Sequence, residues 1–314
     1  MFVRIRPSAP IGVAALLTFS AALPTVGETQ ISAAERQQTV LVTGASTGIG
    51  RKITERLAAD GYFVYAGARK EADLQALGAI KNVQAVRLDV TSKQDIRAAV
   101  DAITRGGRGL YGLVNNAGVG TAGSFTDMRP EEFDLVMAVN MYGPYRVTRA
   151  FAPLIIAQKG RITTIGSIAG ILSGRDIGAY SMSKHAMEAF TDSLALQMNE
   201  LGVQVSIVEP GNYDSQIVRN AVARGVKSEY AVDRSKYKEP DEVADAVERA
   251  LFEPIPKRRY MVVPNQDEAE FTIRKQIEQL VQLNEGQPYS YNRDALIKML
   301  DEALVGSRPR AKQP

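Results

Sequence analysis

The chain has no cysteine and a single histidine among its 314 residues. The lack of cysteine excludes disulfides and thiol catalysis, although it does not fix the compartment in which the protein works. The one histidine, His185, follows Lys184 and lies on a different helix face from Tyr180, so we expect it to be structural. No cluster of histidine or acidic residues in the sequence has metal-ligand spacing, and we expect no metal.

An excess of charge of one sign is also missing. The sequence has 38 basic and 35 acidic residues, and no basic block is interleaved with aromatic residues. Nucleic-acid binding needs such a block, so we exclude that partner. There is no internal repeat at a solenoid period.

The length would allow two domains, but the chain alternates between strand and helix patterns without a break from Thr39 to about Val263. This alternation predicts an α/β fold with a single doubly wound, Rossmann-like parallel sheet that has helices on both faces. We expect this domain to span residues 39–264. An N-terminal segment, residues 1–38, would precede it, and a C-terminal helical extension, residues 265–314, would follow.

A glycine-rich run follows the first predicted strand. Thr39 to Thr43 is apolar and β-branched, as expected of a strand buried on both faces, and Arg51 to Leu57 opens a helical pattern. Between them, residues 43–50 read Thr-Gly-Ala-Ser-Thr-Gly-Ile-Gly. A helix N-terminus offers unpaired N–H groups, and glycines let the backbone approach phosphates. The run predicts a pyrophosphate site. Its glycine spacing differs from the commonest dinucleotide fingerprint, so an ordinary glycine-rich turn is the alternative.

The end of the second predicted strand bears on which dinucleotide would bind there. The strand from Phe63 to Gly67 is soon followed by Arg69 and Lys70. An acidic residue at this place hydrogen-bonds the adenosine ribose, whereas an arginine accommodates the 2′-phosphate of NADP. The sequence therefore favours NADP(H). Because Glu71 and Asp73 lie just beyond, it stays open that the two cations are only solvated charges.

The next two strands end in residues that can line a nucleotide site. Val83 to Leu88 runs into Asp89 and Val90, where the adenine ring would lie in this architecture. The fourth strand begins at Gly112 and runs into Asn115-Asn116-Ala117-Gly118. Adjacent asparagines at a strand end can hold neighbouring turns through side-chain hydrogen bonds.

Tyr180 and Lys184 are four positions apart, which places them on the same face of a helix. A free phenol is a weak acid, and a neighbouring ammonium stabilises its ionised form, which makes tyrosine a usable general acid and base. Such pairs also occur by chance on exposed helices. Here the apolar residues that follow predict a buried helix: Ala186, Met187, Phe190, Leu194 and Leu196.

Two further polar residues complete a proton-transfer site. Ser167 follows a strand that begins at Gly160, so its hydroxyl would lie at the carboxyl edge of the sheet, where ligands bind in doubly wound folds. Asn140 is predicted in mid-helix, where an amide is a poor helix former. It is either exposed to solvent or bends the helix to hold a water. A phenol, an ammonium and a hydroxyl beside a nucleotide site indicate hydride transfer to or from a nicotinamide.

The motifs together resemble the short-chain dehydrogenase/reductase superfamily. The similarity runs from about Val40 to Gly211 and more loosely to about Pro264. It rests on the runs at 43–50 and 115–118 and on Asp89, Val90, Asn140, Ser167, Tyr180, Lys184, Pro210 and Gly211. The stretches 188–194 and 205–213 are similar to the branch that contains retinol, hydroxysteroid and hydroxybutyrate dehydrogenases. Since that branch often prefers NAD, NAD(H) stays open beside NADP(H).

The resemblance implies a role for each matching residue. Tyr180 would exchange the proton, and Lys184 would hold the nicotinamide ribose and favour the phenolate. Ser167 would hydrogen-bond the substrate oxygen, and Asn140 would anchor a water of the proton relay. The cofactor would contact Gly44, Ser46, Thr47, Gly48, Ile49, Gly50, Arg69, Asp89, Val90, Asn116, Ala117, Gly118, Tyr180, Lys184, Pro210, Gly211, Tyr213 and Ser215.

The resemblance also implies an activity: hydride transfer between NADP(H) and a moderately apolar ketone or secondary alcohol, with a retinoid-like or steroid-like substrate in view. The alternatives are an NAD-linked alcohol dehydrogenase, and a scaffold that senses NADP(H) and binds a protein partner without turnover. Epimerisation or dehydration with a bound nicotinamide is a third. Family members are commonly dimers or tetramers, so we expect a homodimer or homotetramer.

The N-terminal segment has the order of a secretory signal. Arg4 and Arg6 precede an apolar run from Ala9 to Leu23, which is short and interrupted for a membrane span. A cleaved signal, a retained membrane anchor and a disordered tail stay open. Because an NADPH-dependent enzyme needs a supply of its cofactor, function favours the cytoplasm. Any membrane association would run through this segment.

Two regions after the predicted cofactor turns have less certain roles. The polar segment from Gln216 to Glu239 is either a lid over the substrate or a surface insertion. Two later stretches, 268–283 and 294–304, have apolar residues at helical spacing: Ile273, Ile277, Leu280, Val281, Leu296, Leu300 and Leu304. We expect these stripes to pack on the domain. Covering the substrate pocket or joining a partner subunit is the alternative.

Overall fold

The computed structural model describes residues 37–227 and 236–306. The chain divides into two units, residues 1–36 and 37–314, and the fold described below is that of the second unit. The signal-like segment therefore lies outside the described residues, apart from its last two, Gln37 and Gln38.

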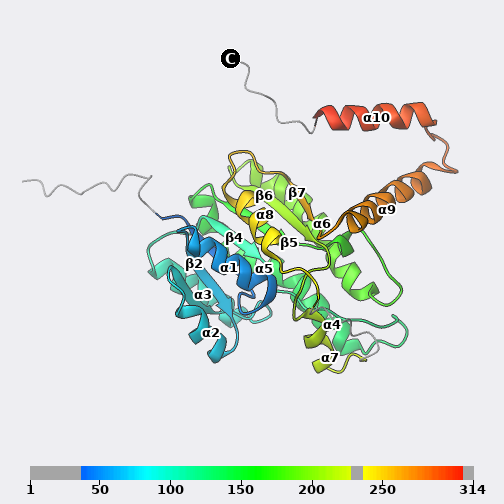
Figure 1. Ribbon diagram of the computed structural model, residues 1–314. Helices are drawn as coiled ribbons and strands as arrows, with labels where there is room; N and C mark the ends of the chain where they lie inside the picture. The colour runs from blue at the N-terminus through cyan, green and yellow to red at the C-terminus, as the bar shows by residue number, and fades with distance from the viewer. Residues whose placement is uncertain (1–36, 228–235, 307–314) are drawn as a thin grey trace, which may run out of the picture. The chain divides into compact units, whose positions relative to one another are not determined.

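Seven parallel strands form one sheet in the order β3-β2-β1-β4-β5-β6-β7 (Figure 1). The strands are β1 Thr39–Val42, β2 Phe63–Ala68, β3 Val83–Arg87, β4 Gly112–Asn115, β5 Arg161–Ile165, β6 Gln204–Pro210 and β7 Arg259–Val262. The strand order reverses between β1 and β4, which makes their carboxyl ends the expected ligand-binding edge. The predicted doubly wound parallel sheet is confirmed.

Helices cover both faces of this sheet (Figure 1). One face is covered by α1 Gly48–Ala59, α2 Glu71–Gly78 and α8 Asp241–Phe252, and the other by α3 Lys93–Arg105, α5 Tyr142–Ala157 and α6 Gly178–Asn199. The strand β1 shows why both are needed, since successive side chains point to opposite faces. Val40 and Val42 pack with Leu57 of α1, whereas Leu41 packs with Phe151 of α5. All of these side chains are buried, as expected of a central parallel strand.

The C-terminal extension forms the two predicted helices, α9 Gln266–Asn284 and α10 Arg293–Gly306. The expectation that their apolar stripes pack on the domain is wrong. The stripe residues of α9 are about half exposed, and Leu300 and Leu304 of α10 are 59% and 54% exposed. The face of α9 that is buried instead contains Thr272, whose hydroxyl donates to the backbone of Glu268. In the described ranges, no helix is both long and apolar enough to cross a membrane.

Candidate active site

The glycine turn between β1 and α1 is too tight for side chains at two of its positions. Gly44 has φ +65°, and a Cβ atom on it would lie 2.8 Å from the Cα atom of Ala117. A Cβ atom on Gly50 would lie 2.3 Å from the backbone oxygen of Gly44. Only glycine lets the first turn of α1 approach the end of β1 this closely.

The N-terminus of α1 suits an anionic group. In the part of the chain that the structure describes, no side chain caps this end, where Thr47 is the N-cap, and no acidic residue lies in the first turn. Its N–H groups and the positive end of the helix dipole are therefore available to a phosphate. Ser215 lies over the turn, because a Cβ atom on Gly48 would be 3.6 Å from the Cβ atom of Ser215. The turn fits the diphosphate of a dinucleotide.

Asn116 fastens this turn to the end of β4. Its side-chain amide donates to the backbone oxygens of Thr43 and Gly44, at 2.9 and 3.0 Å. The hydroxyl of Thr43 accepts the N–H groups of Asn116 and Ala117 in return. Asn115 turns the other way and donates to the hydroxyl of Thr148 in α5. One asparagine of the pair thus holds the neighbouring turn, as expected, and the other holds a helix.

Arg69 lies at the edge expected to take the adenosine end of a dinucleotide. Its side chain is 63% exposed, and its guanidinium lies 3.7 Å from the carboxylate of Asp89. Burial by itself would raise the pKa of Asp89. Hydrogen bonds from the hydroxyl and N–H of Thr91, together with the charge of Arg69, hold that pKa below its usual value. Asp89 therefore stays ionised, and its loose pairing leaves most of the Arg69 guanidinium open to a phosphate.

The sequence interpretation missed Arg87, the last residue of β3. Its guanidinium donates to the backbone oxygen of Arg69 at 2.7 Å and to the carboxylate of Glu71 at 2.8 Å. It therefore holds the turn that carries Arg69 and also forms an ion pair with Glu71. Parallel register pairs Arg87 with Ala68, so a cation at the end of the third strand was the signal in the sequence.

Tyr180 and Lys184 lie on α6, facing the carboxyl end of β5. Lys184 is 6% exposed, and its ammonium donates to the backbone oxygen of Ile165 at 2.8 Å. The same ammonium lies 5.7 Å from the centroid of the Tyr180 ring, whose side chain is partly exposed. The predicted buried helix thus holds the pair, but Leu196 is 68% exposed and lies on its outer side.

Ser167 follows β5 at the same edge and caps the short helix η2, Ile168–Gly170. Its hydroxyl accepts the N–H of Ala169 at 3.1 Å and donates to the backbone oxygen of Pro210 at 3.5 Å. The second contact is long, so the hydroxyl proton is weakly held and can turn toward another acceptor. Lys184 is hydrogen-bonded to the end of β5 and Ser167 follows that end, so the same part of the sheet positions both side chains.

The sequence interpretation placed Asn140 in the middle of a helix, and this is wrong. The helix α4, Pro130–Asn140, ends at this residue, and α5 begins two residues later. The Asn140 side chain is buried: its oxygen accepts the N–H of Val119, and its amide donates to Val119 and to the hydroxyl of Ser183. Ser183, next to Lys184, is a positioning residue that the sequence interpretation missed.

Two residues near the site have their side chains engaged elsewhere. Tyr213 is 1% exposed, and its hydroxyl donates to Glu242 of α8 at 2.6 Å. Burial and this carboxylate raise the pKa of Tyr213 far above its usual value, so only its backbone is placed for the predicted cofactor contact. The ring Nδ1 of His185 lies 2.9 Å from the backbone oxygen of Ser181 in the same helix, an arrangement that suits the structural role expected of it.

The helix α7, Ile217–Ala223, lies in the segment predicted as a lid or an insertion, of which residues 228–235 lie outside the described residues. Ile217 packs on Gly120, in the loop that follows Asn116. At the other end of α7, the guanidinium of Arg224 donates to the backbone oxygen of Gly120 and to Glu132, which is 6% exposed. The hydrogen bond to Gly120 fixes this end of α7 beside the loop from β4, and the ion pair with Glu132 fixes it beside α4.

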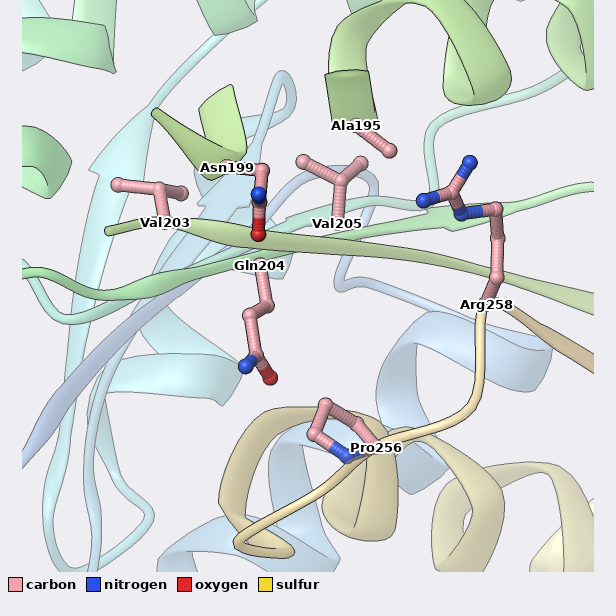
Figure 2. Close-up of a pocket in the computed structure, with 7 residues that line it drawn as sticks. All are labelled: Ala195, Asn199, Val203, Gln204, Val205, Pro256 and Arg258. Atoms are coloured by element: carbon pink, nitrogen blue, oxygen red, sulfur yellow. The ribbon is translucent and has the colours of Figure 1, made fainter. Parts of the chain in front are cut away.

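A cavity of about 180 Å³ lies beside α6 and β6 (Figure 2). It is lined by Ala195, Asn199, Val203, Gln204, Val205, Pro256 and Arg258. Gln204 begins β6 and Pro210 ends it, so the cavity lies at the opposite end of the strand from Ser167. It contains none of the predicted site residues.

Known proteins match this chain in sequence and in structure. Residues 38–224 match the family model for short chain dehydrogenase. The chain is 35% identical over 184 residues to the mitochondrial D-beta-hydroxybutyrate dehydrogenase of Rattus norvegicus, with 55% of this chain and 54% of that enzyme covered. It is 38% identical over 184 residues to retinol dehydrogenase 5 of Mus musculus, with 57% of each covered. The chain thus spans little more than half the length of these curated relatives.

A solved structure matches a larger part of this chain. A metagenomic short-chain oxidoreductase in complex with NADP is 32% identical, with a TM-score of 0.60, and the alignment covers 73% of this chain and 98% of that one. The glycine turn, the polar residues at the carboxyl edge of the sheet and the family match over residues 38–224 agree with one another. The chain belongs to the short-chain dehydrogenase family.

Proposed function

We propose that this protein transfers hydride between NADP(H) and a moderately apolar ketone or secondary alcohol. The observation that carries the proposal is that the end of β5 positions both Lys184 and Ser167. Lys184 donates a hydrogen bond to this strand end, Ser167 follows it in the chain, and Tyr180 lies on the same helix face as the lysine. A general acid, a cation and a hydroxyl donor then come from the carboxyl edge of the sheet, the edge that also carries the glycine turn. The two curated relatives are named as dehydrogenases of hydroxybutyrate and of retinol, which supports this reaction class.

Each side chain has one task in this proposal. A bound nicotinamide supplies or accepts the hydride. In the reducing direction, the phenol of Tyr180 gives its proton to the substrate oxygen, and the hydroxyl of Ser167 donates a hydrogen bond to the same oxygen. The ammonium of Lys184 stabilises the phenolate that remains and can hydrogen-bond the ribose. Asn140 holds the loop at Val119 and the helix at Ser183, and it is the proposed anchor of the water that returns the proton.

The preference for NADP(H) rests on the edge at the end of β2. Arg69 is exposed and only loosely paired, and Arg87 holds its backbone. A guanidinium can bind the 2′-phosphate of NADP through two hydrogen bonds at once. The neutral ribose hydroxyl that NAD has at this position does not require a cation. The metagenomic relative in complex with NADP supports this choice. NAD(H) is the alternative, since Asp89 already competes for Arg69.

The loops around the site support the proposal of an apolar substrate. A Cβ atom on Gly178 would lie 2.4 Å from the ring of Phe125, so this ring packs directly on the start of α6 beside Tyr180. Phe125 and Ile177 are 59% and 37% exposed, and the N–H of Gly123 donates to the backbone oxygen of Asp176 and holds the two loops together. Exposed apolar side chains at the rim of a site favour a substrate that can cover them.

Two further parts of the proposal concern the whole protein. We expect it to work where NADPH is supplied, which favours the cytoplasm, with export or membrane association through residues 1–38 as the alternative. We also expect a homodimer or homotetramer, which size measurement in solution would establish.

The proposal is tested by following NADPH oxidation with a panel of ketones that ranges from small polar to steroid-like. Wild-type protein should oxidise NADPH with at least one apolar ketone, and Tyr180→Phe should lose about 100-fold or more of that rate with NADPH affinity retained. Tyr289→Phe, at a site that is 82% exposed, is the matched control. NADPH binding without turnover of any ketone or alcohol would favour the scaffold alternative, and a wild-type rate in Tyr180→Phe would overturn the mechanism.

A further inference from the structure

Two acidic side chains, one buried and one mostly buried, lie behind the segment that carries Ser167. Glu188 is on α6, one turn beyond Lys184, and its side chain is 15% exposed. Glu209 is on β6, directly before Pro210, and is 2% exposed. Neither residue has a part in the proposed proton transfer. A buried carboxylate is costly unless it is paired, so these two need a physical explanation.

Their hydrogen bonding supplies that explanation. The two carboxyl groups lie beside each other, close enough for a hydrogen bond between them. Among the described residues, one buried oxygen of each (Oε1) receives no hydrogen bond. A pair of ionised carboxylates has only acceptors and cannot satisfy these oxygens, whereas a carboxylic acid beside a carboxylate can donate a hydrogen bond. The pair therefore requires one proton, held between the two residues.

The charges around the pair do not remove this requirement. Arg259 of β7 donates to Glu188 at 3.2 Å, but its shorter contact, 2.7 Å, is with Asp192 of α6. Arg258 also faces Asp192, at 3.9 Å. The nearest cation on α6 itself, Lys184, is turned to Ile165. Burial, and after it the charge of Glu188, raises the pKa of Glu209 to about 8. Burial raises the pKa of Glu188 as well, although Arg259 opposes it.

Glu188 touches the segment from Gly166 to Gly170 on both sides of Ser167. A Cβ atom on Gly170 would lie 2.9 Å from the Oε1 atom of Glu188, and one on Gly166 would lie 3.3 Å from the same atom. The segment is also bonded to the strand that carries Glu209: Gly166 donates to the backbone oxygen of Val208, and Ser167 donates to that of Pro210. Glu209 stands between these two contacts.

We propose that Glu188 and Glu209 share one proton, and that this shared proton holds the 166–170 segment, and with it Ser167, in position. Both are positioning residues, and the importance of Ser167 itself rests on the proposed function. When the proton is lost in alkaline solution, two buried carboxylates face each other and repel. The segment that packs on them should then loosen, through a titration separate from that of Tyr180.

Hydrogen exchange tests the proposal without any substrate. The measured quantity is the protection of the N–H groups of Gly166 and Gly170, corrected for the intrinsic pH dependence of exchange, from neutral to alkaline pH. In wild-type protein the protection should fall severalfold as the pair titrates. In Glu209→Gln it should stay constant, because the amide N–H donates at every pH. Glu200→Gln, at an exposed position of the same kind, should behave like the wild type.

Two results would overturn the proposal: wild-type protection that is flat across the alkaline range, or a loss of protection with the same midpoint in Glu209→Gln. If Glu209→Gln fails to fold, Glu188→Gln serves the same purpose from the other side of the pair. Thermal unfolding of the wild type gives a second measurement. Because the folded pair keeps its proton to a higher pH than an unfolded glutamate does, stability should fall as the pH rises from the ordinary pKa of glutamate to the pKa in the folded protein, and should level off above it. A melting temperature that does not change with pH across that window would contradict the shared proton.

An activity measurement then connects the pair to the proposed function. The alkaline loss of kcat for ketone reduction should be smaller in Glu209→Gln than in the wild type, with the KM for NADPH unchanged. Absence of turnover in both proteins would count against the proposed function and leave the exchange result intact. The alkaline loss of kcat could instead be identical in the wild type and in Glu209→Gln while hydrogen exchange behaves as expected. That result would mean that the pair holds the 166–170 segment without positioning Ser167.

Discussion

The ammonium of Lys184 lies 2.8 Å from the backbone oxygen of Ile165, the last residue of β5. This contact joins the middle of a buried helix to the strand end from which the chain continues to Ser167. It explains how a lysine that is 6% exposed is tolerated on α6, since the carbonyl replaces part of its lost hydration. It also sets where the charge lies relative to Tyr180, which the spacing along the helix alone does not.

The contact predicts that Lys184→Met separates activity from stability. The variant leaves the Ile165 carbonyl unpaired, at a cost of about 1–3 kcal/mol, but it also removes a buried charge, so the net change in unfolding free energy should be small. Turnover should fall by about 100-fold or more. Steady-state kinetics and thermal unfolding check both, with Lys298→Met, 78% exposed, as the control. A variant that unfolds but retains its rate in the folded fraction would contradict this role.

Arg69→Ala should weaken NADPH binding and leave NADH binding nearly unchanged. Loss of a charge-assisted contact costs about 1.5–3 kcal/mol, which corresponds to about 10- to 100-fold in Kd. The carboxylate of Asp89, left without its partner, would repel the phosphate further. Fluorescence titration with both cofactors measures the effect, and Arg97→Ala on the exposed side of α3 is the control. Equal affinities for NADPH and NADH in wild-type protein would turn the search toward NAD-linked alcohol oxidation.

Gly50→Ala should abolish cofactor binding and destabilise the fold. The added Cβ atom would lie 2.3 Å from the Gly44 oxygen and from the Asn116 amide, so the turn and its support must both move. Overpacking of this kind costs about 1–3 kcal/mol. Gly78→Ala is the control, because its Cβ atom would lie 4.0 Å from its nearest neighbour. Chemical denaturation and NADPH titration measure the two effects, and unchanged binding in Gly50→Ala would argue against a phosphate site at this turn.

Tyr213→Phe should reduce stability by about 1 kcal/mol and leave NADPH affinity unchanged, because the lost hydroxyl is bonded to Glu242 and not directed at the glycine turn. Hydrogen bonds from Lys238 and then from Tyr213 hold the pKa of Glu242 below its usual value. The stability that comes from this lowered pKa is present above the ordinary pKa of a glutamate and is lost as the pH falls through the value in the folded protein.

The stability deficit of Tyr213→Phe should therefore be largest near neutral pH and shrink in acid, which denaturation at several pH values would measure. A strong loss of NADPH affinity would instead show that the phenol contacts the cofactor. A deficit that grows in acid would contradict the assigned hydrogen bond.

Much of this protein is determined by short stretches of its sequence. The buried strand at Thr39, the glycines that follow it and the helical spacing of Tyr180 and Lys184 depend on neighbours within a few residues, because backbone sterics and side-chain periodicity act over that range. The same holds for the sheet, since alternating strand and helix patterns permit few other arrangements. These features were predicted, and the structure has them.

Tertiary structure decided how the distant parts meet. The contacts of Asn140 with Val119, of Arg224 with Gly120 and of Lys184 with Ile165 join residues far apart in the chain. The apolar stripe of α9 correctly predicted a helix, but the face predicted to be buried is exposed. Periodicity identifies an apolar face of a helix and does not identify what packs against it. The physical reason is the same in each case. The packing of helices and strands against one another determines which side chains meet, and a local sequence pattern does not contain that information.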